Sequence, residues 1–164
     1  MSKALVLGCG ASGIASVRFL KRRGWTVALA DTRESPSSLA EFKQEFPDVP
    51  FTGGSLPLEL LDGCDALVLS PGLSPEHSAV SSLVAKARAS GMDVLGEIEL
   101  FARELAHLNK TQGYRPKVVA VTGTNGKTTT TRLTGLMVRQ ANRTVCTAGN
   151  IGPNAVCELD RLLE

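Results

Sequence analysis

The chain has 164 residues, 43% of them hydrophobic, so it can bury a core without disulfides or structural metals. Eighteen basic residues against sixteen acidic ones leave a formal charge of +2, which excludes a general attraction to nucleic acid or to an anionic membrane. The four cysteines form no C-x-x-C pair, and no apolar run reaches the roughly 20 residues of a membrane span. We therefore expect a cytoplasmic protein without nucleic-acid or membrane partners.

Short apolar runs alternate with helical patterns over the first 95 residues, the order of βαβ units in a parallel sheet. We expect strands at residues 3–7, 26–30, 49–52, 66–69 and 93–95. Apolar side chains recur at helical spacing in three stretches between them, from Ile14 to Leu20, from Leu39 to Phe46 and from Val80 to Ala87. These elements predict a Rossmann-like α/β domain over residues 1–95.

A polar stretch follows this first domain. Residues 97–108 predict a helix, and residues 109–116 are polar and contain Gly113 and Pro116, which makes them the best candidate for a linker. We accordingly treat residues 96–116 as a helix and linker region.

The βαβ pattern then restarts, which argues for a second domain. We expect a strand at residues 117–121, a helix that ends near Ala141 and a strand at residues 144–148. A parallel sheet with its crossover connections cannot be completed in the about 50 residues that remain. Residues 117–164 are therefore expected to form an incomplete P-loop α/β domain.

A glycine-rich turn of the form G-x-G-x-x-G lies between the first strand and the first helix, where Gly8, Gly10 and Gly13 hold the three glycine positions. Glycines let the backbone approach a diphosphate, whose charge is met by the helix N-terminus. Asp31 ends the second strand and could accept hydrogen bonds from a ribose or a base edge. The pattern alone is typical of NAD binding, or simply of tight packing between strand and helix.

Further residues lie near the same sheet edge. Arg33 suits an additional anionic group, although a solvated loop arginine fits the sequence equally well. Ser70 and Gly72 follow a buried strand at the edge where open parallel sheets bind ligands. His77 lies in the same loop, but a single histidine without a partner is more often a surface residue.

A second anion-binding loop follows the strand expected at 117–121. It comprises Gly123, Thr124, Asn125, Gly126, Lys127, Thr128 and Thr129. Backbone N–H groups of such a loop cradle phosphates, Lys127 can reach the terminal phosphates of ATP, and the Thr128 hydroxyl can hold Mg²⁺. Val121 stands where the general P-loop has its first glycine. Asn150, after the next expected strand, would bring an amide to the same edge.

These motifs together resemble the Mur ligases of peptidoglycan synthesis over the whole chain. The residues that carry the resemblance are Gly8 to Gly13, Asp31-Thr32-Arg33, Ser70-Pro71-Gly72, Gly96-Glu97-Ile98-Glu99-Leu100, Gly123 to Thr129 and Gly149-Asn150-Ile151-Gly152. The phosphate loop alone also admits folylpolyglutamate synthase. Asp31-Thr32-Arg33 and Ser70-Pro71-Gly72 narrow the resemblance to the member that adds D-glutamate.

The resemblance implies a role for each site. The first turn would hold the UDP end of UDP-N-acetylmuramoyl-L-alanine rather than NAD, through Gly10, Ala11, Ser12, Asp31, Thr32, Arg33, Gly72 and Asn150. ATP would phosphorylate the substrate carboxylate, and the amine of D-glutamate would displace phosphate from the acyl phosphate. Lys127 and the magnesium on Thr128 would act as the catalytic groups, because they neutralise charge on the transferring phosphoryl group.

The sequence departs from the family by ending at Glu164. The family's further magnesium ligands and its D-glutamate site would lie beyond that residue, so we expect the chain alone to bind nucleotide without turnover. Two alternatives stay open at this point. One is the NAD(P)-binding domain of a dehydrogenase, and the other is a non-catalytic nucleotide-binding module.

Overall fold

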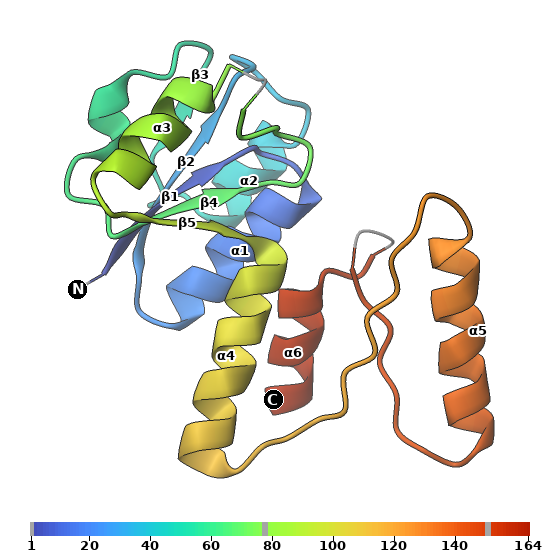
Figure 1. Ribbon diagram of the computed structural model, residues 1–164. Coiled ribbons are helices and arrows are strands. Elements are labelled where there is room, and N and C mark those ends of the chain that lie inside the picture. The colour runs from blue at the N-terminus through green and yellow to red at the C-terminus, as the bar shows by residue number, and fades with distance from the viewer. Residues whose placement is uncertain (1, 77–78, 150–151) are drawn as a thin grey trace. The chain divides into compact units, whose positions relative to one another are not determined.

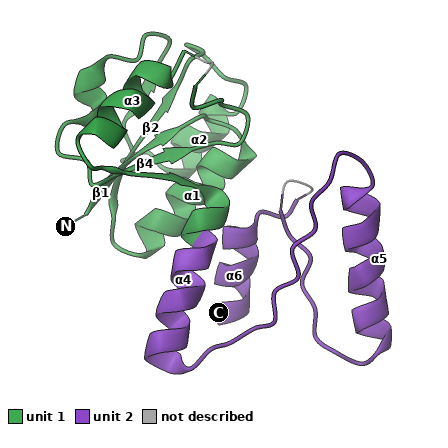
Figure 2. Cartoon of the chain, viewed as in Figure 1, with its two compact units in different colours: residues 1–100 green, residues 101–164 purple. Residues whose placement is uncertain are grey.

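The structure is a computed structural model that describes residues 2–76, 79–149 and 152–164. The chain divides into two compact units, residues 1–100 and residues 101–164 (Figure 2). No helix among the described residues has both the length and the apolar character needed to cross a membrane.

The first unit is built around a five-stranded parallel sheet with the strand order β3-β2-β1-β4-β5 (Figure 1). Its strands are β1 (Lys3–Leu7), β2 (Thr26–Asp31), β3 (Phe51–Gly53), β4 (Ala66–Leu69) and β5 (Asp93–Gly96). All five predicted strands are confirmed, although β3 begins two residues later than expected. The central strand β1 is almost wholly buried because both of its faces are covered.

Helices cover both faces of this sheet. They are α1 (Ala11–Arg22), α2 (Leu39–Glu45) and α3 (Ser81–Ala89), together with the short 3₁₀ helix η1 (Leu58–Leu61). α1 and α2 lie side by side, since Arg18 pairs with Glu45 at 2.6 Å across them. Right-handed crossovers place α1 and α2 on one face and α3 on the other (Figure 1).

The core follows from the alternation of side chains along the strands. Leu5 and Leu7 of β1 point to the same face as Leu67 of β4, where they pack with Leu83 and Ala87 of α3. All five side chains are inaccessible to solvent. This packing fixes the carboxyl ends of β1, β2 and β4 next to one another.

The second unit is helical where it has regular structure. α4 (Glu97–Gln112) starts in the first unit, and α5 (Lys127–Gln140) and α6 (Ala155–Leu163) follow. α4 runs four residues past the predicted end because the polar residues after Leu108 tolerate a helix, and Gly113 stops it with a positive φ of 69°. The predicted linker is therefore helical up to Gln112.

The strands predicted at residues 117–121 and 144–148 are wrong for this chain. Both segments are described and neither pairs with any strand. Val118 and Val119 are 60% and 72% exposed, although their β-branched side chains favour an extended backbone. A strand is stabilised by a paired neighbour and a covered face, and these residues have neither. The loop and the helix of the expected P-loop domain do form.

Candidate nucleotide-binding sites

The turn between β1 and α1 is shaped by its glycines. Gly8 has a φ of +101°, and its N–H donates to the carbonyl of Ala30 at 2.7 Å. A Cβ on Gly13 would lie 1.8 Å from the carbonyl oxygen of Gly8, so only glycine allows α1 to start this close to β1. Gly10 is the N-cap of α1 and has open space around it. The geometry leaves room for an anion at the N-terminus of α1.

Three polar side chains from neighbouring segments hold this turn. The N–H of Cys9 donates to Asp31 Oδ2 at 2.7 Å, and the hydroxyl of Ser38 donates to the carbonyl of Cys9. The hydroxyl of Ser70 donates to the carbonyl of Gly8 at 3.2 Å. The backbone of the turn is therefore fixed by groups at the ends of β2 and β4 and by the residue before α2.

Asp31 is a buried carboxylate whose acceptor positions are all used. Its Oδ1 accepts the N–H and the Nε–H of Arg33 at 2.9 and 2.8 Å, and its Oδ2 accepts Arg33 Nη2 at 2.8 Å besides Cys9. Hydrogen bonds from the Arg33 side chain are the main reason that the pKa of Asp31 falls to about 2, and the backbone N–H groups of Arg33 and Cys9 act in the same direction. The carboxylate is ionised at neutral pH.

The remaining residues predicted for the first site follow the same sheet edge. Ala11 and Ser12 are in the first turn of α1, and Thr32 lies between Asp31 and Arg33. Gly72 lies in an exposed turn after β4. Asn150 and His77 lie outside the described residues. The structure thus brings Gly10 to Ser12 and Asp31 to Arg33 to adjacent strand ends, with Gly72 following the neighbouring strand β4.

Ser38 is a functional candidate that the sequence alone did not single out. Its local sequence indicates only the beginning of a helix, and its hydroxyl reaches Cys9, 29 positions earlier in the chain. A contact of that kind depends on the tertiary arrangement of α2 against the turn. The sequence did not indicate which of the three serines Ser35, Ser37 and Ser38 makes this contact.

The second loop has the backbone of an anion site in the second unit. Gly123 and Gly126 have φ values of +148° and +75°, and Gly126 is the N-cap of α5. Lys127 Nζ donates to the carbonyl of Gly123 and, at 3.2 Å, to that of Thr124. The ammonium group of Lys127 thus contacts carbonyls of its own loop, and residues 122–130 are exposed to solvent.

The described residues partly fit a magnesium ion. Thr128 lies in the first turn of α5, directly after the glycines of the loop that would hold the phosphates. The described part of the chain contains no cluster of three or more His, Cys, Asp or Glu residues that could bind a metal. Within the described residues a magnesium ion would be held by Thr128, the nucleotide phosphates and water, whereas magnesium sites of this kind usually include one or two carboxylates as well.

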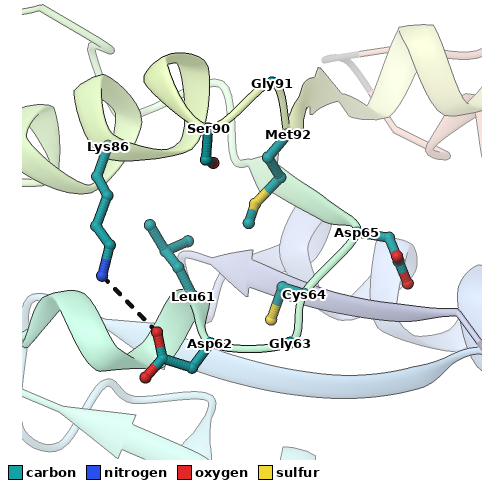
Figure 3. A pocket seen from close by; sticks show the side chains of 9 residues that line it. All are labelled: Leu61, Asp62, Gly63, Cys64, Asp65, Lys86, Ser90, Gly91 and Met92. Atoms are coloured by element: carbon teal, nitrogen blue, oxygen red, sulfur yellow. Dashed lines mark ion pairs between the residues drawn. The ribbon is translucent and has the colours of Figure 1, made fainter.

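A cavity of about 440 Å³ lies elsewhere, at the amino-terminal ends of β4 and β5. It is bordered by the turn 61–65 and by the end of α3, where Lys86 Nζ is 3.7 Å from Asp62 Oδ1 (Figure 3). The glycine-rich turn is at the opposite, carboxyl-terminal edge of the same sheet. Ligands of open parallel sheets bind at that second edge, so we do not assign the cavity to the nucleotide.

Two family models match separate parts of the chain. The family model for the Mur ligase MurD-like N-terminal domain matches residues 2–96, and the model for the Mur ligase middle domain matches residues 121–162. A pseudomurein peptide ligase type C from Methanothermus fervidus has a similar structure, with a TM-score of 0.52 and 27% identity. That likeness covers 86% of this chain and 26% of the other.

Curated relatives match almost the whole chain. A UDP-N-acetylmuramoylalanine–D-glutamate ligase of Cupriavidus pinatubonensis is 51% identical over 94% of this chain and 31% of its own length. A ligase of the same name from Ralstonia nicotianae is 51% identical over 98% of this chain and 32% of its own length. The chain therefore spans less than one third of these relatives. The chain belongs to the Mur ligase family, and its first domain matches the MurD-like N-terminal domain.

Proposed function

We propose that this chain is the substrate-nucleotide domain, with the first part of the ATP-binding domain, of a ligase that adds D-glutamate to UDP-N-acetylmuramoyl-L-alanine. The turn from Gly8 to Gly13 would hold the diphosphate, and Asp31, Thr32 and Arg33 would meet the uracil end. The reaction belongs to cytoplasmic peptidoglycan synthesis. We place the domain boundaries at residues 1–95, 96–116 and 117–164.

The observation that carries this proposal is the fixed turn at the end of β1 beside Asp31 and Arg33. A dehydrogenase uses the acidic residue after the second strand to accept hydrogen bonds from the ribose hydroxyls. Here the guanidinium of Arg33 occupies both oxygens of that carboxylate. The pair is better suited to a base or an anionic group than to a ribose diol, and this favours a uridine nucleotide over NAD.

The loop from Gly123 to Thr129 would bind ATP in the complete enzyme. ATP supplies the phosphoryl group that activates the substrate carboxylate. Lys127 would leave the carbonyls of Gly123 and Thr124 to contact the phosphates, and Thr128 and Asn150 would contribute to magnesium and substrate binding respectively. Because the chain spans less than one third of the length of the curated ligases, we expect no turnover from this chain alone.

Parallel titrations test the proposal. We expect the 164-residue chain to bind UDP-N-acetylmuramoyl-L-alanine, measured calorimetrically, and to show no comparable heat with NADH. Gly13→Ala, which displaces β1 or α1 at the turn, should abolish binding, and Ser90→Ala at the opposite sheet edge is the control. Tight NADH binding without binding of the uridine compound would reverse the assignment. ADP release that depends on D-glutamate would overturn the expectation of no turnover.

A further inference from the structure

The two peptide units around Cys9 accept hydrogen bonds from, or donate them to, three side chains. In the unit between Gly8 and Cys9, the carbonyl accepts from Ser70 and the N–H donates to Asp31. In the unit between Cys9 and Gly10, the carbonyl accepts from Ser38. Cys9 is fully buried and Asp31 is 3% exposed, so water cannot easily replace the bond that joins them.

The Ser38 contact determines where the next N–H points. A trans peptide unit is planar, with its C=O and its N–H directed oppositely. Fixing the Cys9 carbonyl on Ser38 therefore fixes the N–H of Gly10, the N-cap residue of α1. The N–H of Cys9 is already used by Asp31, so the donors left for an anion begin at Gly10 and continue into the first turn of α1.

We propose that Ser38 and Asp31 are positioning residues for diphosphate recognition, which they support by holding the Cys9 peptide units and so aiming the donors from Gly10 onward. The inference rests on the proposed uridine-nucleotide site and adds a role that is separate from contact with the base. Holding donors in place before binding lowers the ordering cost of the complex. Positioned N–H donors therefore increase the affinity for a ligand that carries a diphosphate, and not the affinity for the nucleoside alone.

The two residues differ in how they can be tested. Asp31 also accepts hydrogen bonds from the Arg33 side chain and is placed near the base in the proposed site, so replacing it changes more than the Cys9 peptide unit. Ser38 has no assigned ligand contact, and among the contacts described its hydroxyl engages the carbonyl and the thiol of Cys9. Replacing Ser38 therefore isolates the positioning effect.

The experiment compares UDP with uridine as ligands of the whole 164-residue chain. We expect Ser38→Ala to weaken UDP binding by about fivefold to tenfold and uridine binding by less than about twofold. Ser38→Thr keeps the hydroxyl and should restore UDP binding to within about threefold. Ser37→Ala, at the exposed neighbouring serine, is the matched control and should change neither affinity. Equal losses for both ligands, or no loss for UDP, would overturn the proposal.

Amide resonances of the unliganded chain separate this inference from the proposed function. Ser38→Ala should shift the ¹⁵N–H signal of Gly10, and Asp31→Asn should shift that of Cys9, while signals of β5 stay in place. Wild-type protein that binds neither UDP nor uridine would contradict the proposed function. Unmoved Gly10 and Cys9 signals would contradict the positioning role whether or not the ligands bind.

Discussion

The two units of this chain have similar sequence patterns and different structures. In residues 1–100, apolar runs become five paired strands, and the turn after β1 is braced by Asp31, Ser38 and Ser70. In residues 101–164, the runs at 117–121 and 144–148 stay unpaired. Both units contain a glycine loop at a helix N-terminus. The difference shows that the glycine loop before α5 takes its local shape without a paired strand before it.

The two glycine loops also differ in the residues that hydrogen-bond to them. Cys9 in the first turn is fully buried and is bonded to side chains 22 and 29 positions away. Lys127 in the second loop is exposed, and within the described residues its side chain donates to carbonyls three and four positions away. Local contacts form without tertiary structure, whereas distant contacts need a packed core. We therefore expect changes in the first unit to cost much more stability.

The largest effect is expected for Gly13→Ala. The added Cβ would lie 1.8 Å from the carbonyl oxygen of Gly8, so the strand or the helix must move. We predict a loss of about 3 kcal/mol or more in the free energy of unfolding. Urea unfolding followed by the fluorescence of Trp25, the single tryptophan, measures it. Gly10→Ala has open space and should cost less than about 1 kcal/mol, and equal losses would show that the turn is not tightly packed.

The next contrast is between apolar residues of the two units. Leu67→Ala removes a fully buried side chain of β4 and should cost about 3 kcal/mol. Leu136→Ala removes a side chain that is 52% exposed on α5 and should cost less than about 0.5 kcal/mol. Thermal unfolding by circular dichroism compares the two. A similar cost for both would mean that α5 has a packed core around it in solution.

Asp31 gives a pH-dependent contrast. Its pKa is lowered to about 2 in the folded chain, so its contribution is present above the unfolded pKa of about 3.9 and is lost as the pH falls toward 2. The contribution is on the order of 1 to 2 kcal/mol, because Arg33 is partly exposed to solvent. Asp31→Asn should flatten the loss of stability between about pH 4 and pH 2. An unchanged slope would contradict the buried contact with Cys9 and Arg33.

The smallest effect on stability is expected for Lys127→Ala. The lysine is exposed and its partners are carbonyls of its own loop, so its removal should change the free energy of unfolding by less than about 0.5 kcal/mol. In the complete enzyme the same change should abolish measurable ATP-dependent ligation, because no lysine would then neutralise charge on the ATP phosphates. Lys117→Ala is the control for charge. Full activity of the Lys127 variant would remove this loop from the ATP site.

The sequence predicted the first unit well because the patterns that indicate its strands and its first turn are local in the sequence. Apolar alternation located the strands, and the glycines of the first turn indicated the β1–α1 connection. It predicted the second unit poorly because an apolar run such as 117–121 shows that a strand is favourable but not whether a partner is present. α4 also ran beyond its predicted end, because only Gly113 supplies a stop.

The sequence predicted which residues would lie at the sheet edge after β1 and β2, but not the contacts between their side chains. Asp31 and Arg33 stand out from their spacing after the glycines, but their mutual hydrogen bonds depend on side-chain conformations that spacing does not determine. Ser38 could not be found, since its partner is Cys9, in another βα unit. Residues that bind through common motifs are visible in the sequence. Residues that hold those motifs in place become visible only when the fold is known.

Amide hydrogen exchange of the ¹⁵N-labelled chain, recorded with and without UDP, tests the contrast between the two units most directly. We predict slow exchange for the β1 residues Leu5 and Leu7, additional protection of Gly10 to Ser12 when UDP is present, and fast exchange at residues 117–121 in both states. Protection of residues 117–121 equal to that of β1, or no response of Gly10 to Ser12 to UDP, would contradict the account.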